Sequence, residues 1–390
     1  MGSGAETWIG SLDGGEPRLL LRGDAQARYA EPGYLLFKRG PLFSQRIDPR
    51  DFHLVGEPVR LTDAVVGSNG GSTYFALTTS TTGTLAYAAA QGSDTQLTWR
   101  DRTGRALGSL PMNDAVEPAL SPDGTTVAMA RGPTRGSRDL WLYDVKRSIP
   151  TRWTLDSGGN HSPVWSPDGN YLTYAGTREG SFDRIYRKPI SASGAEEPLF
   201  IEHSGSSPTD WSADGRFIVF HNAVIGDQRR GQDLWLLSLP DLQVKPLAQT
   251  SFNEIQGALS PDGRWIAYTS DESGIFEVYV QPFHGGGPKR LVSRGGGAEP
   301  RWRRDGRELF YISGELRLMS VAITSGAVFE ARCPEILFGA NVPDLAYPYS
   351  RRYDVTPDGR RFIVQEPIGR GGPSSLTVVV NWPALLPKDK

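Results

Sequence analysis

The stretch GALSPDGRWIAYTSDESGIFEVYVQPF, from Gly257 to Phe283, decides the fold. Its first turn, Ser260-Pro261-Asp262-Gly263, has Pro where a type I turn prefers it, Asp next, and Gly where the backbone becomes left-handed. Runs of alternating apolar residues follow this turn and the next one. Alternation with β-branched and aromatic residues is the signature of a strand, so the stretch predicts antiparallel strands joined by tight turns.

The same turn recurs along the chain, each time before an alternating run. The copies are Ser121-Pro122-Asp123-Gly124, Ser166-Pro167-Asp168-Gly169, Ser212-Ala213-Asp214-Gly215, Ser260-Pro261-Asp262-Gly263, Arg303-Arg304-Asp305-Gly306 and Thr356-Pro357-Asp358-Gly359. Successive Asp residues are 45, 46, 48, 43 and 53 positions apart. A repeat of about 40–50 residues is typical of the blades of a β-propeller. Weaker copies occur upstream, at Thr81-Thr82-Gly83 and Glu31-Pro32-Gly33.

We therefore predict an all-β fold, one β-propeller of four-stranded antiparallel blades, with strands A to D in each blade. Counting both weak copies gives eight blades, and seven if one is false. The stretch from Glu6 matches strands C and D, whereas the last turn, at Asp358, supplies A and B. A blade mixing N- and C-terminal strands would close the ring and remove exposed edges. The expected boundaries are a tag or disordered start at 1–5, the propeller at 6–382 and a tail at 383–390.

Composition excludes several classes of protein. The formal net charge of −2 and the pI of about 6.3 leave no basic field for nucleic acid. Cys333, the only cysteine, excludes a disulfide framework and a Cys-based zinc site. No stretch reads as a signal peptide or a transmembrane segment, so we expect no direct membrane insertion. We also expect the protein to be a monomer.

No catalytic residue can be assigned from motifs. An Asp required for chemistry would not recur in six turns, so the repeated Asp is interpreted as a turn residue. His284-Gly285-Gly286-Gly287 resembles the oxyanion loop of esterases, but the chain has no Gly-x-Ser-x-Gly nucleophile elbow.

Binding residues are expected where the chain enters strand A, because strand A lines the central channel of a propeller. This mouth lies opposite the repeated turns. The predicted ligand-binding set is Asn113, Glu117, Asn160, His161, Glu254, Gln256, Glu299 and Arg351. Glu202 and His203 enter a strand in the same way, and Tyr347 and Tyr349 lie in a long late insertion. The alternative is a water-filled polar funnel without a ligand.

A metal site is a second interpretation of the same mouth. Its ligands would be Glu117, His161, Glu254 and Glu299. Carboxylate oxygens suit Ca²⁺, and a histidine would admit another divalent cation.

The repeats resemble those of TolB-like, WD-repeat-like propellers. Segments such as EPGYLLFKRG, RWRRDGRELFY and TPDGRRFIV also resemble the C-terminal sensor region of bacterial membrane-anchored Ser/Thr protein kinases. Kinase motifs themselves are absent. This resemblance implies a sensor that lies outside the cytoplasm, in the periplasm, as a fragment of a larger signalling or envelope protein.

Three functions follow as hypotheses. The first is a non-catalytic module that binds a protein, a peptide or a small ligand. The second is a metal-dependent hydrolase of the phosphotriesterase, lactonase or esterase type, by analogy of architecture, with the cation at the channel. The third is a structural partner within an envelope assembly.

Overall fold

The computed structural model describes residues 5–10, 14, 16–23, 27–38, 42–62, 77–88, 95–132, 137–155, 158–178, 183–191, 194–200, 205–223, 231–285, 287–325, 328–342, 350–368 and 376–386. Nearly all regular structure in these residues is antiparallel β-sheet, so the predicted all-β class is confirmed. Contacts divide the chain into two compact units. We call residues 94–369 the central unit, and residues 1–93 with 370–390 the terminal unit.

The described residues of the central unit form six sheets, which we number as blades in chain order. Blade 1 is β11 (Ala115–Leu120), β12 (Thr126–Arg131), β13 (Asp139–Asp144) and β14 (Ile149–Arg152). Blade 2 is β15 (Asn160–Trp165), β16 (Tyr171–Thr177), β17 (Asp183–Pro189) and β18 (Glu197–Phe200). Blade 3 is β19 (Ser206–Trp211), β20 (Phe217–Ala223), β21 (Gln232–Ser238) and β22 (Val244–Ala248).

The remaining blades follow the same order with two variations. Blade 4 is β23 (Glu254–Leu259), β24 (Trp265–Ser270), β25 (Glu277–Pro282) and β26 (Arg290–Leu291). Blade 5 is β27 (Gly297–Trp302), β28 (Glu308–Ser313), β29 (Arg317–Ser325), β30 (Phe329–Ala331) and β31 (Glu335–Gly339), with β30 and β31 both paired to β29. Blade 6 is β32 (Tyr353–Val355), β33 (Arg361–Pro367), β9 (Thr95–Asp101) and β10 (Ala106–Asn113).

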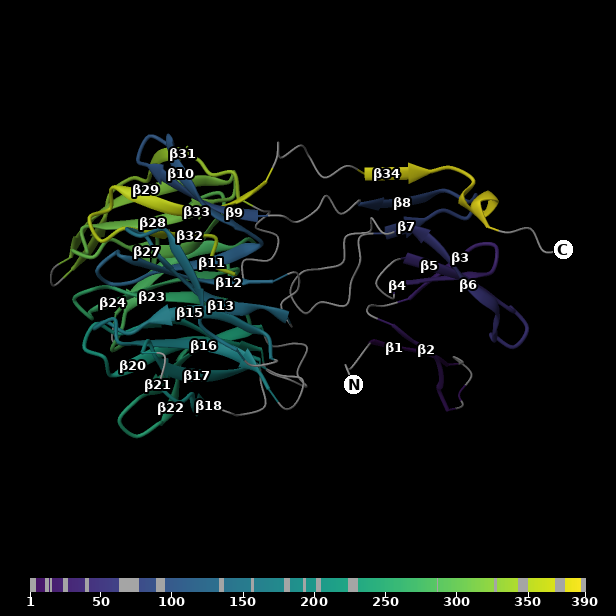
Figure 1. Cartoon of the computed structure of the whole chain (residues 1–390), viewed down its shortest axis with the longest axis horizontal. Helices are drawn as coiled ribbons and strands as arrows, with labels where there is room; N and C mark the ends of the chain where they lie inside the picture. The colour runs from purple at the N-terminus through teal and green to yellow at the C-terminus, as the bar shows by residue number, and fades with distance from the viewer. Residues whose placement is uncertain are drawn as a thin grey trace. The chain divides into compact units, whose positions relative to one another are not determined.

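Blade 6 mixes strands from the two ends of the central unit, and Figure 1 shows β33 beside β9. Ile363 of β33 pairs with Trp99 of β9. A mixed closing blade was predicted, but its predicted N-terminal partner was wrong. The stretch from Glu6 forms β1, which pairs with β2 and not with the hairpin at Asp358. Turn chemistry is local, and pairing over more than 250 residues is decided by packing.

Buried apolar clusters join each blade to the next and close the ring. In each cluster, residues from two neighbouring blades meet. Examples in ring order are Leu140 with Trp165, Ile185 with Trp211, Leu234 with Leu259, Val280 with Leu309, Phe310 with Phe362, and Ile363 with Leu120. The described part of the central unit is therefore a closed ring of six blades.

The terminal unit contains smaller sheets. Its strands are β1 (Ala5–Ile9), β2 (Arg18–Gly23), β3 (Arg28–Ala30), β4 (Tyr34–Lys38), β5 (Leu42–Ile47), β6 (Leu54–Thr62), β7 (Leu77–Thr79), β8 (Leu85–Ala88) and β34 (Leu376–Val379), followed by the 3₁₀ helix η2 (Trp382–Leu385). The sheets are β1-β2, β3-β4-β5-β6 and β34-β8-β7. Trp382 is fully buried in the terminal unit with Leu36 and Leu85.

Both weak upstream turns are real hairpin turns, at β3-β4 and β7-β8, but both lie in the terminal unit. The predicted count of eight blades, or seven, in one ring is therefore not confirmed. The predicted propeller at 6–382 spans both compact units, and the predicted tail at 383–390 includes part of η2. No helix in the described ranges has the length and apolar character needed to cross a membrane.

Candidate functional site

The repeated turns are structural, as predicted. In the opening stretch the Ser260 hydroxyl donates to Oδ1 of Asp262 at 2.6 Å, and the N–H groups of Arg264 and Trp265 donate to Asp262 and Ser260. Gly263 takes the left-handed conformation, with φ of 68°, that glycine adopts readily. The side chains of Asp123, Asp168, Asp214 and Asp358 make the same bonds. Asp262 therefore orders a turn.

Predicted site residues Glu117, Gln256 and Glu299 occupy the same place in blades 1, 4 and 5, four positions before the turn. All three are buried, and all three have positive φ, between 56° and 61°. Non-glycine residues rarely adopt this conformation, which is held only where the surroundings determine it. These three residues therefore share one unusual backbone conformation at the same position of their inner strands.

The side chains of these three residues join neighbouring blades. The carboxylate of Glu117 accepts the N–H of Ser162 at 2.5 Å, and the amide oxygen of Gln256 accepts the N–H of Glu299 at 2.9 Å. The carboxylate of Glu299 accepts the N–H and the guanidinium of Arg352, at 2.6 and 2.5 Å. Each side chain thus satisfies a buried or partly buried backbone donor of the next blade, as such N–H groups require.

The residues of the predicted metal site have protein partners too. Nε2 of the fully buried His161 lies 3.0 Å from Asp183, and Glu254 accepts bonds from the hydroxyl and the N–H of Thr250. Burial raises the pKa of Glu254 above its usual value. Among the described residues, no three His, Cys, Asp or Glu side chains form a group that could hold a metal ion. The cation stays a prediction from the sequence.

The remaining predicted residues are dispersed. Asn160 is buried and donates to Thr154 and to the carbonyl of Gly158, whereas Asn113 is exposed on blade 6. Glu202, His203, Tyr347 and Tyr349 lie outside the described residues. Glu117, Gln256 and Arg351 do come together, around an inner pocket of about 20 Å³. That volume holds about one water molecule.

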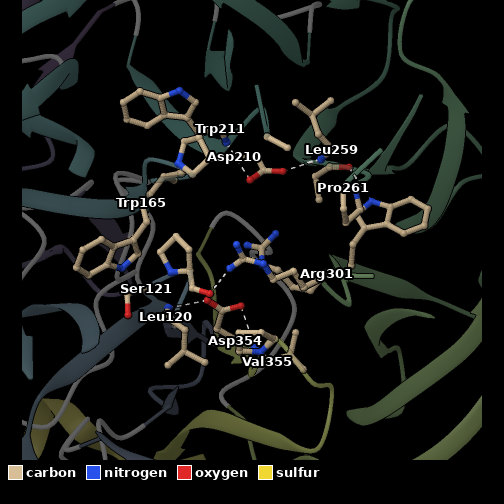
Figure 2. A pocket seen from close by; sticks show the side chains of 18 of the residues that line it. Leu120, Ser121, Trp165, Asp210, Trp211, Leu259, Pro261, Arg301, Asp354 and Val355 are labelled. Atoms are coloured by element: carbon tan, nitrogen blue, oxygen red, sulfur yellow. Dashed lines mark hydrogen bonds between the residues drawn. The ribbon is translucent and has the colours of Figure 1, made fainter. Parts of the chain in front are cut away.

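A larger cavity of about 420 Å³ lies on the same axis at the end where the repeated turns are (Figure 2). We call it the channel cavity. The inner strands of all six blades line it. It is at the opposite end from the predicted mouth, and of the predicted set only Arg351 lines it. The sequence analysis missed this site because it interpreted the repeated turns only as connections between strands.

Four charged residues, which we call the floor, line the channel cavity: Asp210, Arg301, Arg351 and Asp354. Arg301 and Arg351 also line the inner pocket, so they stand between the two cavities. In Figure 2, Asp210 and Asp354 lie on opposite sides, with the side chain of Arg301 between them. Asp210, Arg301 and Asp354 stand two positions before their turns, where the other three blades have Ala119, Val164 and Ala258. Aligning the internal repeats on this position would have revealed the floor.

Both floor carboxylates bind backbone across a blade boundary. Asp210 accepts the N–H of Trp211 at 2.9 Å and of Leu259, in blade 4, at 2.6 Å. Asp354 accepts the N–H of Val355 at 2.9 Å and of Leu120, in blade 1, at 2.8 Å. Burial raises the pKa of Asp210, although these bonds and the charge of Arg301 act in the opposite direction.

The floor arginines have few partners. Nη1 of Arg301 donates to the carbonyl of Pro300 at 2.8 Å, and Nε of Arg301 is buried with no hydrogen-bond partner in the described structure. Nη2 of Arg351 donates to the carbonyl of Thr209 at 2.9 Å. Burial, and then repulsion from Arg301, lowers the pKa of Arg351 to about 10. Arg351 therefore remains charged at neutral pH.

The walls and mouth of the channel cavity, which we call the rim, are mostly apolar. Trp165, Trp211 and Trp302 contribute their indoles, and each indole N–H donates to a backbone carbonyl, at 2.9, 3.1 and 3.0 Å respectively. The second turn residues complete the rim: Pro122, Pro167, Ala213, Pro261, Arg304 and Pro357. The guanidinium of Arg304 reaches across to the carbonyl of Pro122. A ligand would meet apolar carbon at the rim and charge at the floor.

Comparisons with known proteins agree on the fold. Residues 79–230 match the family model described as the TolB beta propeller domain. The solved structure of a putative TolB from Agrobacterium tumefaciens superimposes with a TM-score of 0.55 over 71% of this chain and 99% of that chain, at 18% identity. At that identity the likeness supports the fold alone.

Curated relatives align over part of the chain. An uncharacterized protein of Agrobacterium fabrum, Atu1656, is 26% identical over 50% of this chain and 68% of its own length. An uncharacterized peptidase of Bacillus subtilis, YuxL, is 24% identical over 42% of this chain, and the Tol-Pal system protein TolB of Helicobacter pylori is 26% identical over 40%. The chain spans only 32% and 36% of these two proteins. The chain is an all-β protein that carries TolB-like β-propeller repeats over residues 79–230.

Proposed function

We propose that this protein is a non-catalytic binding module that takes a ligand or a protein segment at the channel cavity. The observation that carries the proposal is the cavity itself, about 420 Å³ in volume, lined by all six blades, with an apolar rim over a charged floor. Concave sites with apolar walls and a few convergent polar groups are the usual form of ligand sites. The six blades position these groups around one cavity.

An envelope role is part of the same proposal. The relative named as a Tol-Pal system protein supports a protein partner and a place in the periplasm. The resemblance of the repeats to sensor regions of membrane-anchored kinases supports signalling as the use of binding. The envelope role and the signalling role both concern whole proteins that are longer than the aligned residues. Each role therefore requires its own interaction experiment.

Blocking the channel cavity tests the proposal. Ala213 is exposed at the rim, where most other blades have Pro, so Ala213→Trp would fill the mouth without removing a floor contact. The matched control is Arg264→Trp, an exposed position of another repeated turn that does not line the cavity. Partners captured from bacterial envelope fractions should bind the unmodified protein and the control, and fail to bind Ala213→Trp. Equal capture by all three would contradict the site.

A metal-dependent hydrolase is the competing function, and the relative named as a peptidase supports hydrolysis as the alternative. Turnover of esters, lactones or phosphotriesters that requires a divalent cation, and that is lost in Glu254→Gln, would favour it. Elemental analysis without bound metal, together with no turnover in the presence of added Ca²⁺ or Zn²⁺, would leave binding as the function.

A further inference from the structure

We propose that the channel cavity recognises a carboxylate group carried on an apolar body, with Arg301 and Arg351 as the receptors of the carboxylate. The inference rests on the proposed function, because it names the ligand chemistry of the same cavity. A free organic acid and the C-terminus of a peptide share this chemistry.

The carboxylates of Asp210 and Asp354 do not occupy the N–H donors of Arg301 and Arg351. Both oxygens of Asp210 and both oxygens of Asp354 accept backbone N–H groups, at 2.6 to 2.9 Å. The nearest ion-pair contact is long, 4.0 Å between Nη1 of Arg351 and Asp354. The two acids thus join blades 3 to 4 and 6 to 1, and they form no bidentate pair with a guanidinium.

The guanidinium groups therefore keep unused donors. A guanidinium has five N–H groups in a rigid fork, yet Arg301 and Arg351 each donate one hydrogen bond in the described structure. Nε of Arg301 is buried without a partner. Leaving buried donors unmet is costly, and a carboxylate can accept two parallel N–H bonds from one fork. A bound carboxylate would accept hydrogen bonds from these unused N–H donors.

Charge favours an anion with a single negative charge. The charged residues lining the channel cavity are Asp210 and Asp354 against Arg301, Arg304 and Arg351, a formal sum of 3 − 2, or +1. A monoanionic carboxylate neutralises this sum. A phosphate dianion would exceed it in a cavity where two carboxylates already lie.

The rim accounts for the apolar body. Because their indole N–H groups already donate to backbone carbonyls, Trp165, Trp211 and Trp302 offer ring carbon to a ligand. Four of the six second turn residues are Pro. The ligand would place its carboxylate at the floor and its apolar part between these rings.

A matched pair of small probes tests the inference. N-acetyl-leucine and N-acetyl-leucinamide differ only in whether the carboxyl group is free, and calorimetry at low salt would measure both dissociation constants. The acid should bind at least tenfold more tightly, since hydrogen bonds to charged groups contribute about 1.5–3 kcal/mol and 1.4 kcal/mol is tenfold. A short peptide ending in leucine, compared with its C-terminal amide, separates a peptide source from a free acid.

Variants assign the effect to the floor. Arg301→Lys keeps the charge and loses the fork, so it should weaken binding of the acid about tenfold while leaving the amide unchanged. Arg304→Ala removes an exposed charge at the rim and should weaken the acid less. Arg264→Ala, exposed on the same turns and outside the cavity, should change neither. Circular dichroism checks that each variant is folded.

Each outcome decides the question. Equal binding of acid and amide overturns carboxylate recognition and leaves the binding function standing. Tighter binding of inorganic phosphate than of the acid assigns the floor to another anion. Absence of acid binding also overturns the inference, whereas the Ala213→Trp experiment judges the binding function separately. An acid-selective affinity reduced in Arg301→Lys and retained in Arg264→Ala confirms it.

Discussion

At the scale of single residues, the turn aspartates explain why one short motif recurs in every blade of the central unit. Asp168 accepts the hydroxyl of Ser166 at 2.6 Å, and the N–H and the side-chain amide of Asn170 at 3.0 and 2.9 Å. In blade 5, Arg303 replaces the serine, and its guanidinium donates to Asp305 at 2.6 Å. The chemistry of the turn is kept while its donor changes.

Asp168→Ala should lower the free energy of unfolding by about 1 kcal/mol, because it removes hydrogen bonds of ordinary strength from one turn. Urea denaturation followed by fluorescence measures the loss. Glu330→Ala is the control, since Glu330 is exposed on β30 and makes no side-chain bond in the described structure. A loss no larger than that of the control would show that this turn forms without its aspartate.

The same aspartates predict how stability depends on pH. Hydrogen bonds from Ser166 and Ser121 lower the pKa of Asp168 and Asp123, and Thr356 and Arg303 do so for Asp358 and Asp305. A carboxylate whose pKa is lower in the folded state stabilises the protein above its unfolded pKa, and that stabilisation is lost as pH falls through the folded pKa.

Stability should therefore decline as pH falls below about 4, the ordinary range of aspartate. Thermal unfolding between pH 6 and pH 3 measures this decline. Asp168→Asn cannot titrate, so its decline should be shallower than that of the unmodified protein. An identical pH profile for both would count against this origin of the acid sensitivity.

At the scale of elements, the inner strands do more than line a channel. Side chains of Glu117, Gln256 and Glu299 bind the backbone of the following blade, so each inner strand is held by its neighbour as well as by its own sheet. Residues that the sequence marked as ligand candidates on account of their polarity are thus also part of the scaffold.

Glu299→Ala should cost about 3–5 kcal/mol of unfolding free energy, because it breaks a buried ion pair with Arg352 together with the hydrogen bond from the Arg352 backbone. Glu315→Ala breaks an ion pair with Arg317 on the surface and should cost at most about 1 kcal/mol. Chemical denaturation of the two variants compares these losses. Similar losses would contradict the inter-blade role of Glu299.

At the scale of the whole molecule, the ring is closed by β9 and β10 from one end of the central unit and by β32 and β33 from the other. The apolar cluster around Ile363, Leu97 and Leu120 packs across this closure. The blades therefore depend on both ends of the central unit.

A fragment of residues 94–369 should fold and unfold in one cooperative transition, since all six blades and the clusters between them lie within it. A fragment of residues 94–350 lacks β32 and β33 and should fail to unfold cooperatively, because β9 and blade 1 lose their partners. Circular dichroism against urea distinguishes the two. Cooperative unfolding of the shorter fragment would show that the ring does not need its closing blade.

The sequence by itself determined the all-β class, the six strong turns and the strands that follow them, because turn chemistry and alternation act within a few residues. It also determined that the repeated Asp is structural. Only the tertiary structure decided that β9, and not the stretch from Glu6, pairs with the hairpin at Asp358, since pairing between segments more than 250 residues apart is set by packing. The channel cavity was likewise a tertiary result. Asp210, Arg301 and Asp354 are far apart in the chain, and only closure of the ring brings their charges to one axis.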